Sequence, residues 1–565
     1  MTYGFPPDTS ALRKFTDWFP GVYNASSYAP AVPLDGGTAV REGVAVYSLP
    51  LVTLSLPLQG ILFCLLVAFI VSYAMSSWRW LPPQPRRLPI IGNLFQLTDK
   101  RWLCSRDCKE RFGEVMYLDV LGKPTIIFNS LKSASEVLEH RASNSSGRPR
   151  LIVTNEILLG GIGIALMDHG ELWRRMRRAA HEALTKAAVQ RYYPIQTKEA
   201  TILVSALLAN PENREQHFQR TAASAIMSIT YDYPTLTSGK EKAVQDIDRI
   251  LNWASRATVG TSLVEFFPWM IHIPQRFAKW KREALKQAAK RSEIYLRLFN
   301  RVKIDLVSVG VRPSFSASLI EHQDRHRLSE REMAYLAGQL YGAGFETTST
   351  SLMWWTLAMV AFPEVQRRAH AELDAVVGRA RLPTYADAPR LPYVWAIIRE
   401  VLRWRPTLRL GLAHRAAEDD WYDGMFIPKG ATCMANIWHC NHDRAVFGDD
   451  ADEFKPERHL GDHGELLPGP KETNQEGHVS FGFGRRACVG RHLANESLFI
   501  RTARILWAAT LKCGRDENGK EQPPDTNAFV EIGVFTRPQP FDCIITPRFP
   551  GVQSILVEER ESFED

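Results

Sequence analysis

The sequence predicts a mainly α-helical α+β fold, in which one large domain with small β-sheets follows a single membrane-spanning helix. Helical periodicity runs through most of the chain, and strand-like alternation appears only in short pieces near residues 115–128 and 425–438. No linker or internal repeat follows the amino-terminal region, so the 565 residues fit one large domain better than several. The third observation is an uncharged apolar stretch at residues 54–75.

Composition places the chain among folded enzymes and argues against two other classes. With 45% hydrophobic and 23% charged residues, the chain can bury a large core and is not disordered. The net charge of +7 comes from scattered basic residues without a nucleic-acid-binding motif, so we expect no nucleic-acid partner. The cysteines lack disulfide-framework and zinc spacings, which indicates reduced thiols in a cytosolic domain. They are Cys64, Cys104, Cys108, Cys433, Cys440, Cys488, Cys513 and Cys543.

The amino-terminal region predicts a membrane anchor. Residues 54–75 carry no charge, and about 20 helical residues span a hydrocarbon core of roughly 30 Å. Trp78 and Trp80 fit an interfacial belt, and arginines are more frequent after the stretch than before it. We therefore expect a single-pass anchor in the endoplasmic reticulum membrane, with the domain in the cytosol. Residues 1–53 would form a lumenal extension, in which Asn24 begins an Asn-Ala-Ser acceptor sequence for glycosylation.

Two short segments border the main domain. Residues 76–95 are rich in proline, which fixes φ and removes backbone donors, so we expect a stiff, extended hinge after the anchor. The main domain should cover residues 96–548. The remaining residues, 549–565, would form an acidic carboxy-terminal tail.

The ten-residue run that ends at Gly490 surrounds Cys488 with residues that can hold a thiolate. A free thiol has a pKa of about 8.5, so a stable thiolate at neutral pH needs a metal or a positive surrounding rich in donors. Gly482 and Gly484, with Gly490, let successive amide N–H groups point at the sulfur while a flat macrocycle lies against the turn. Arg486 adds a positive charge. The loop therefore predicts a metal-bound thiolate.

The run begins at Phe481 and matches the pattern F-x-x-G-x-R-x-C-x-G, and it resembles the haem-binding loop of the cytochromes P-450. The resemblance covers roughly residues 81–548 and implies the cytochrome P-450 fold. It also implies haem b as the cofactor, with Cys488 as the axial ligand of iron and the loop residues Phe481, Gly482 and Gly490 around it. Further details, at residues 413–424 and 491–495, resemble microsomal fungal members.

Residues 332–362 predict a long apolar helix, interrupted by small and polar residues at 343–348. Serine and threonine in a helix can bond back to a preceding carbonyl group, which loosens the helix and leaves a groove. The run matches the family pattern A/G-G-x-D/E-T-T/S. The resemblance implies two catalytic residues, in which Thr347 assists oxygen activation and Glu346 relays protons from solvent.

Glu400 and Arg403 lie three residues apart, on one face of the helix expected from Val394 onward. They match the E-x-x-R of the family, which Arg458 completes. The resemblance implies a buried structural ion network that shapes the loop leading to the cysteine. His459 stands where the family often has phenylalanine, and we expect this difference to affect local packing alone.

The two propionates of haem need cations or hydrogen-bond donors. Trp173 and Arg177 lie four residues apart, so they share a helical face, and they match the family's W-x-x-x-R. The family register adds His414, which follows the helix that carries Glu400, and Arg486, two residues before the cysteine.

The resemblance implies a monooxygenase that inserts one atom of O2 into a lipophilic small molecule, in fungal secondary metabolism or in the oxidation of foreign compounds. The chain has no flavin or nicotinamide motif, so electrons should come from NADPH–cytochrome P-450 reductase, with cytochrome b5 as a second donor. An acidic partner could dock on Arg174, Arg175, Arg178 and Arg491. By family position, the apolar substrate pocket would be lined by residues 151–167, 345, 348, 408–412 and 532–535.

Three points stay open at the level of sequence. A haem-thiolate isomerase or dehydratase without a reductase would use the same loop, although the presence of both Glu346 and Thr347 disfavours it. A non-catalytic haem-binding membrane protein would lack turnover altogether. The segment 266–274, which basic residues follow, either dips into the bilayer beside a substrate entrance or is a buried loop.

Overall fold

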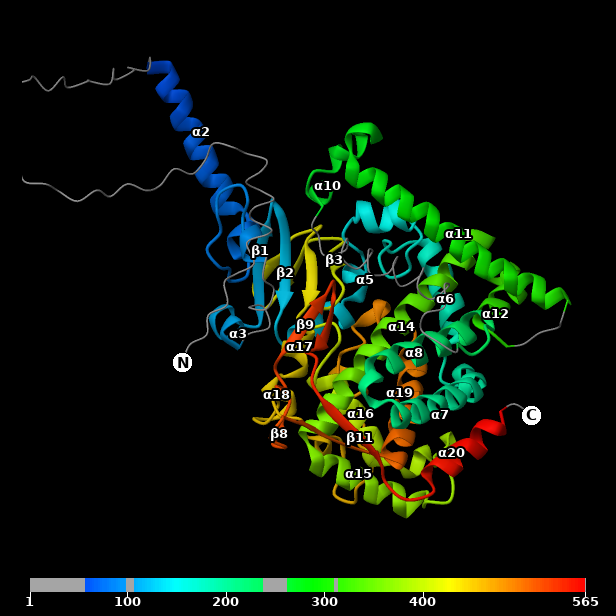
Figure 1. The fold of residues 1–565 in the computed structure, drawn as a ribbon. Helices are drawn as coiled ribbons and strands as arrows, with labels where there is room; N and C mark the ends of the chain where they lie inside the picture. The colour runs from blue at the N-terminus through cyan, green and yellow to red at the C-terminus, as the bar shows by residue number, and fades with distance from the viewer. Residues whose placement is uncertain (1–55, 98–105, 237–261, 309–312, 564–565) are drawn as a thin grey trace, which may run out of the picture. The chain divides into compact units, whose positions relative to one another are not determined.

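The computed structural model describes residues 56–97, 106–236, 262–308 and 313–563 (Figure 1). They belong to two compact units, which divide after Val71. The predicted extension at residues 1–53 lies outside the described residues, and so do Asn24 and Cys104.

Helix α2 (Leu56–Met75) contains no charged residue, and the side chains of Ile61, Phe63 and Leu65 are each more than half exposed. Within the described residues, no helix has both the length and the apolarity needed to cross a bilayer. Residues 54 and 55 of the predicted membrane helix lie outside the described residues. The membrane span stays a prediction.

The proline-rich segment after α2 is fastened to the main sheet. The Pro83 carbonyl accepts a hydrogen bond from the Tyr117 amide at 2.9 Å, and Arg87 forms an ion pair with Asp119 at 3.3 Å. The sheet has the order β1-β2-β6-β3, in which β2 and β6 are parallel and the other pairs are antiparallel. Its strands are β1 (Val115–Val120), β2 (Lys123–Phe128), β6 (Thr432–Ala435) and β3 (His414–Arg415).

The remaining described strands form three small antiparallel sheets. The strand-like pieces predicted near residues 115–128 and 425–438 are confirmed, although the second piece ends in helix α17 (Ile437–Asn441). The small sheets contain β4 (Asp420–Tyr422) with β5 (Met425–Ile427), β9 (Phe529–Ile532) with β10 (Phe535–Pro538), and β7 (Ala509–Arg515) between β8 (Glu521–Gln522) and β11 (Cys543–Pro547).

Helices make up most of the second unit (Figure 1). Its longer helices are α6 (Glu171–Ala183), α7 (Tyr193–Ala209), α8 (Arg214–Tyr231), α11 (Lys279–Ser308), α14 (Glu330–Ala361), α15 (Pro363–Val376), α16 (Pro392–Trp404), α19 (Arg491–Ala508) and α20 (Val552–Glu561). The shorter ones are α3 (Arg106–Phe112), α4 (Leu131–Ala134), α5 (Ala142–Ser145), α10 (Leu263–Phe266), α12 (Phe315–Glu321), α13 (Gln323–His326) and α18 (Arg444–Phe447), with the π-helix η5 (Ile152–Leu158).

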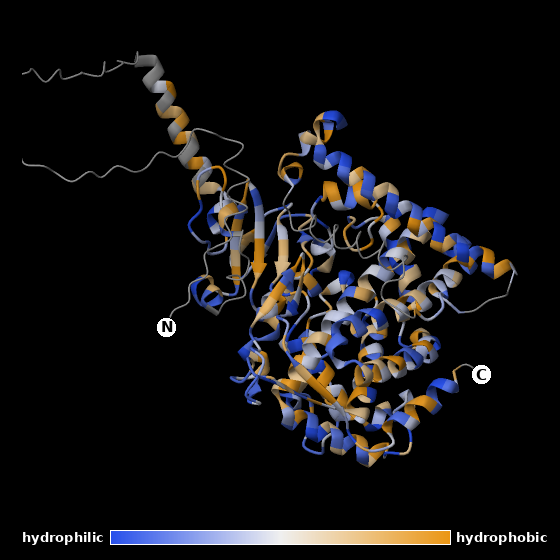
Figure 2. Ribbon diagram, in the orientation of Figure 1, coloured by the Kyte–Doolittle hydropathy of each residue, from blue (hydrophilic) through white to orange (hydrophobic). Residues whose placement is uncertain are grey.

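The central element is α14, the helix predicted at residues 332–362. It begins with a capping box, in which the Ser329 hydroxyl accepts from the Glu332 amide at 3.3 Å and the Glu332 carboxylate accepts from the Ser329 amide at 2.8 Å. Most of its side chains are buried, because α8, α11, α16, α19 and β10 all pack against it. On α11, by contrast, hydrophilic and hydrophobic positions alternate, as expected for a surface helix (Figure 2).

The acidic carboxy-terminal segment contains α20, which packs on the domain. Val552 and Leu556 are buried, and Glu559 forms an ion pair with the buried Arg504 at 2.9 Å.

Candidate active site

A cavity of about 510 Å³ lies between α14 and the loop that precedes α19. Each of the predicted pocket segments contributes to its mainly apolar wall, and so does Cys488. The segments supply Thr154, Leu159, Ile164, Ala165, Leu166, Phe345, Thr348, Leu408, Gly411, Leu412, Ile532, Val534 and Phe535. The segments that the family resemblance predicted for the substrate pocket therefore line one and the same cavity.

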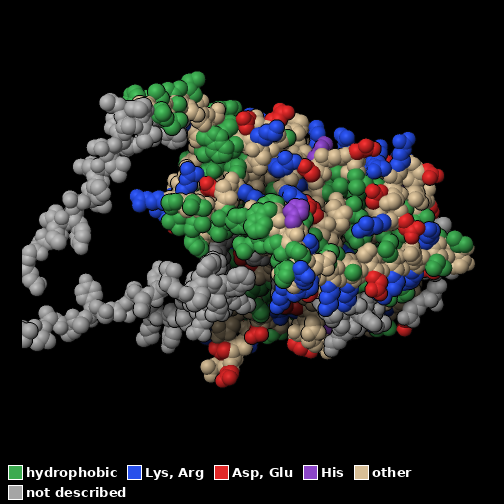
Figure 3. All heavy atoms as spheres, turned by 90° about the horizontal axis from the view of Figure 1, so that it is seen from above, with side chains coloured by type: hydrophobic (Ala, Val, Ile, Leu, Met, Phe, Trp, Pro, Cys, Tyr) green, Lys and Arg blue, Asp and Glu red, His purple; other side chains and the backbone are tan. Residues whose placement is uncertain are grey.

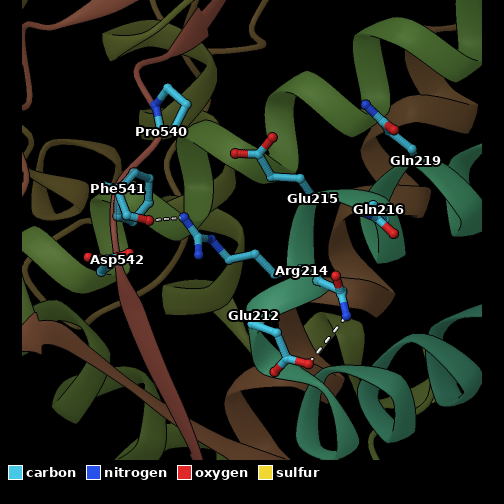
Figure 4. Close-up of a pocket in the computed structure, with 9 residues that line it drawn as sticks. Glu212, Arg214, Glu215, Gln216, Gln219, Pro540, Phe541 and Asp542 are labelled. Atoms are coloured by element: carbon cyan, nitrogen blue, oxygen red, sulfur yellow. Dashed lines mark hydrogen bonds between the residues drawn. The ribbon is translucent and has the colours of Figure 1, made fainter.

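A second pocket lies on the surface, between the start of α8 and the segment before β11 (Figure 4). It is open and polar, and the Arg214 guanidinium donates to the Phe541 carbonyl across it. None of the predicted site residues lines this pocket. We therefore assign the chemistry to the cavity at Cys488.

The cysteine loop is closed by its own backbone. The Cys488 amide donates to the Phe481 carbonyl at 2.8 Å, and Gly482 and Gly484 have φ values of +75° and +57°. A Cβ on Gly484 would lie 2.4 Å from the Leu138 carbonyl oxygen, so this position requires glycine for space as well as for φ. A Cβ on Gly482 would meet nothing within 4 Å, so the loop leaves open space there.

The Cys488 side chain is accessible through the cavity although it lies inside the molecule. Burial raises the pKa of its thiol, while the Gly490 N–H and the charges of Arg177 and Arg491 act in the opposite direction. Burial is the larger effect. Coordination to a metal would supply the stabilisation that a thiolate needs at this position.

The four residues predicted for the propionates all line the same cavity: Trp173, Arg177, His414 and Arg486. The Arg486 guanidinium lies 4.3 Å from the centre of the Trp173 ring and donates to the Ser146 carbonyl at 2.9 Å. Arg177 donates to the Ala487 carbonyl, next to the cysteine.

Arg148 joins this group, and sequence reasoning missed it because no motif marks it. Its guanidinium is buried and donates to the Leu412 carbonyl at 3.0 Å. Burial, followed by the charge of Arg486, lowers the pKa of Arg148 to about 9. Burial and the charges of Arg148 and Arg486 lower the pKa of His414 to about 3, so its ring is neutral at pH 7.

Haem fits this arrangement. Three guanidinium groups, of Arg148, Arg177 and Arg486, converge on a wall of the cavity where no described carboxylate pairs with them within salt-bridge distance, as a site for two propionates requires. The nearby Asp168 is engaged by Arg415. The open space at Gly482 and the thiol of Cys488 complete a site for a flat, thiolate-bound group.

On the opposite wall, α14 presents the predicted acid and alcohol. The Thr347 hydroxyl donates to the Ala343 carbonyl at 2.7 Å, the back-bonding expected from the sequence. The Glu346 carboxylate forms an ion pair with Arg537 of β10, a partner that no sequence motif revealed. Both Glu346 and Thr347 line the cavity.

The predicted ion network is buried behind the cysteine loop. Arg403 donates twice to the Glu400 carboxylate, at 2.8 and 2.7 Å, and Arg458 donates to it at 3.0 Å. His459 Nε2 lies 2.9 Å from the same carboxylate, so the expectation that this residue affects packing alone is wrong. The hydrogen bonds and positive charges hold the pKa of Glu400 well below its usual range despite burial.

Asn441 connects this network to the cysteine loop, and it too was missed. Its carbonyl accepts from Arg403 at 2.7 Å, while its side chain accepts from the Val479 amide at 2.9 Å and donates to the Ser480 hydroxyl at 3.0 Å. The chain of contacts therefore runs from Glu400 to the residue before Phe481.

A cysteine loop fixed by a buried ion network, a cation cluster at its side and an acid–alcohol pair on the opposite helix together define a haem-thiolate protein. A sequence model described as Cytochrome P-450 matches residues 82–543. The chain belongs to the cytochrome P-450 family.

Two similar curated proteins come from fungi. The chain is 49% identical over 492 residues to a cytochrome P-450 monooxygenase of Armillaria gallica, with 87% of this chain and 94% of that one covered. Identity is 41% over 493 residues with cytochrome P-450 monooxygenase 58 of Postia placenta, with 87% and 93% covered. The protein is thus an oxidoreductase of the fungal cytochrome P-450 monooxygenase type.

Solved structures confirm the fold. A zebra fish cytochrome P-450, determined with progesterone, has a TM-score of 0.65 and 24% identity, with 80% of this chain and 100% of that chain covered. The predicted helix-rich domain with small sheets is therefore confirmed.

Proposed function

We propose that this protein inserts one atom of O2 into a lipophilic small molecule, by hydroxylation or a related oxidation, in fungal secondary metabolism or in the oxidation of foreign compounds. The observation that carries the proposal is the position of Cys488, which opens into a mainly apolar cavity whose other wall holds Glu346 and Thr347. An apolar wall of this kind suits a lipophilic substrate.

The site residues would have different roles in this reaction. Haem b, when bound through Cys488, supplies the activation of O2 by thiolate-assisted O–O cleavage. Trp173, Arg177, Arg486 and the neutral His414 would orient it through its propionates, together with Arg148. The Thr347 hydroxyl can hold a water molecule or a proton at the cavity wall. Glu346, on the same wall, can exchange protons with solvent when its contact with Arg537 opens.

Electrons would come from NADPH–cytochrome P-450 reductase, with cytochrome b5 as a second donor. Arg174 and Arg178 are exposed on α6, the helix from which Arg177 reaches the residue before the cysteine. A basic surface there suits an acidic electron donor. Arg175 contributes less, because it donates to the Arg327 carbonyl, and Arg491 is partly neutralised by Glu476 at 3.5 Å.

The protein would act at the endoplasmic reticulum membrane, anchored by residues 54–75 and with its domain in the cytosol. The uncharged α2 and the arginines that follow it support this orientation. Apolar side chains are also exposed around α10, at Leu263, Phe267, Trp269 and Phe277, and Figure 3 shows hydrophobic groups beside Lys and Arg on this face. This favours contact with a bilayer over a buried loop.

Deletion of residues 1–75 should make the protein extractable from membranes by alkaline carbonate, because only the surface contact around α10 would remain. The full-length protein should resist the same extraction, and its release by carbonate would contradict the membrane-spanning anchor.

Two measurements on membranes that contain the protein test the proposed reaction. The carbon-monoxide difference spectrum of the reduced protein should show the strongly red-shifted band of a cysteine-ligated haem. With a reductase and a lipophilic substrate, NADPH should be consumed and an oxygenated product formed. A haem protein that turns over a peroxide substrate without reductase would indicate the isomerase or dehydratase class instead, and the absence of haem would indicate a non-catalytic protein.

Replacement of Thr347 by alanine should preserve haem binding and lower the rate of product formation roughly 100-fold, because the hydroxyl that supports proton delivery is lost. Electrons should then leave as hydrogen peroxide, which is measured together with NADPH and product. Thr356→Ala is the matched control, since the Thr356 hydroxyl makes the same kind of back-bond on α14, to the Leu352 carbonyl at 2.8 Å, without lining the cavity. Full coupling in Thr347→Ala would refute the assignment.

A further inference from the structure

We infer that the substrate carries a carboxylate and that Arg291 of α11 binds it, an inference that rests on the proposed function and narrows its substrate class. Arg291 lines the same cavity as Cys488. Its side chain is 2% exposed, so its charge is removed from bulk water.

The structure gives the Arg291 guanidinium no hydrogen bond or ion pair with any described residue, and its buried Nε atom has no partner. Its one described cation–π contact is with the Tyr295 ring, whose centroid lies 5.8 Å from the guanidinium carbon. Seven other buried arginines of the described chain donate to carbonyl or carboxylate oxygens: Arg148, Arg214, Arg220, Arg403, Arg405, Arg501 and Arg504. Arg409, which is also buried, lies over the Trp438 and Phe529 rings, at 4.3 and 3.6 Å from their centroids. Arg291 differs from the seven because no described oxygen accepts a hydrogen bond from it.

The position of Arg291 is fixed by close packing one helical turn further along α11. The Tyr295 ring lies against Gly338 of α14, where a Cβ would come within 2.5 Å of three ring atoms. Because only glycine allows this approach, α11 lies tightly on α14, and η5 also packs against α11. The guanidinium is thereby held over the cavity, although a long side chain on a surface helix could otherwise reach water.

The cavity offers Arg291 no anion of its own. Among the described residues that line it, Glu346 alone carries a carboxylate, and Arg537 engages that group. The propionates of haem would be taken by the separate group of Arg148, Arg177 and Arg486. The positive charge of Arg291 therefore remains available to bind an anionic group of the substrate.

A guanidinium stays charged at any physiological pH, and a buried charge without a partner destabilises the fold. A carboxylate fits its planar donors in a two-point contact. An apolar molecule with one carboxylate would satisfy Arg291 and the apolar wall together. The contact would also fix which carbon atoms of the substrate lie near Cys488.

Calorimetric titration of the purified holoenzyme with dodecanoate and with methyl dodecanoate tests this inference, because the probes differ in their charge and are similar in their apolar chain. The wild-type protein should bind the acid about tenfold to a hundredfold more tightly than the ester. Arg291→Met should abolish this preference. Equal affinities in the wild-type protein, no measurable binding of the acid, or a preference that survives in Arg291→Met would overturn the inference.

The thermal midpoint of the ligand-free holoenzyme gives a second readout. Arg291→Met should raise it by about 2–4 °C, since an unpaired buried charge is replaced by an apolar side chain of similar length. Arg297→Met is the matched control, because Arg297 is exposed on the same helix, and it should change neither the midpoint nor the preference. A midpoint that falls in Arg291→Met would show that the charge is satisfied within the protein. The carbon-monoxide spectrum of each sample distinguishes the two possible failures. A sample without the red-shifted band would contradict the proposed function, whereas a sample with the band but without a preference for the acid would contradict this inference alone.

Discussion

Replacement of Cys488 by alanine is expected to abolish the red-shifted carbon-monoxide band and all substrate oxidation that depends on NADPH. The thiol opens into the cavity, and its loop is held by the Cys488 amide and by glycines with positive φ. Alanine keeps this backbone but cannot coordinate iron, so the electron donation that drives O–O cleavage is lost. Difference spectra and product analysis measure both effects.

The control for this variant is Cys513→Ala, which removes a thiol from β7 that does not line the cavity. It should retain the spectrum and the activity. If Cys488→Ala kept the red-shifted band, another residue would have to be the axial ligand, and the assignment of the site would fail.

Replacement of Glu400 by glutamine should prevent stable haem incorporation. Glu400 is fully buried, and three positive or hydrogen-bonding partners, Arg403, Arg458 and His459, converge on its carboxylate. Loss of its charge leaves the buried guanidinium group of Arg403 without a carboxylate partner, whereas Arg458 keeps its ion pair with Asp450 at 3.0 Å. An uncompensated buried charge destabilises a protein by about 3–5 kcal/mol. The contacts through Asn441 carry the disturbance to the cysteine loop. The haem content of the purified protein and the denaturant midpoint measure the effect.

Glu364→Gln is the matched control, because Glu364 and Arg367 form a similar pair three residues apart in which both side chains are 71% exposed. Its expected cost is about 0–1 kcal/mol. The loss of stability in His459→Phe should lie between those of the two variants. This substitution removes one hydrogen bond to a buried carboxylate, worth about 1.5–3 kcal/mol, and keeps both arginines. A Glu400→Gln protein with normal haem content would contradict the role of the network.

The same carboxylate predicts how stability depends on pH. The pKa of Glu400 is lower in the folded protein than its ordinary value of 4.5. Its contribution to the free energy of unfolding is therefore fully present above pH 4.5 and is lost as the pH falls through the lower, folded value. The Glu400→Gln variant should lack this part of the acid dependence.

The sequence predicted the elements whose residues stand together in a motif. The loop at Cys488, the pair Glu346 and Thr347, and the E-x-x-R pair each lie within ten residues of chain, and the fold brings each to the cavity or directly behind it. The partners that complete them come from distant segments. Arg537 reaches Glu346 across 191 residues, which no local pattern records.

Arg148, Asn441 and Arg291 could not be predicted for a related reason. Each has an ordinary neighbourhood in the sequence, and its importance comes from what surrounds it in space. Arg148 belongs with Arg486 because both face one wall of the cavity, and Arg291 is exceptional because its neighbours supply no anion. Periodicity and family motifs report neither property.

The parallel pairing of β2 with β6 has a consequence for how the chain reaches its native state. Beside these strands, the Asn436 side chain donates to Asn129 at 3.0 Å across 307 residues. Contacts at such separation form slowly, because a very long loop must close before they add stability. During synthesis, β2 cannot pair with β6 until β6 has left the ribosome, and the cysteine loop leaves the ribosome later still. Haem capture should therefore be a late, post-translational event, sensitive to cofactor supply at the moment when synthesis ends.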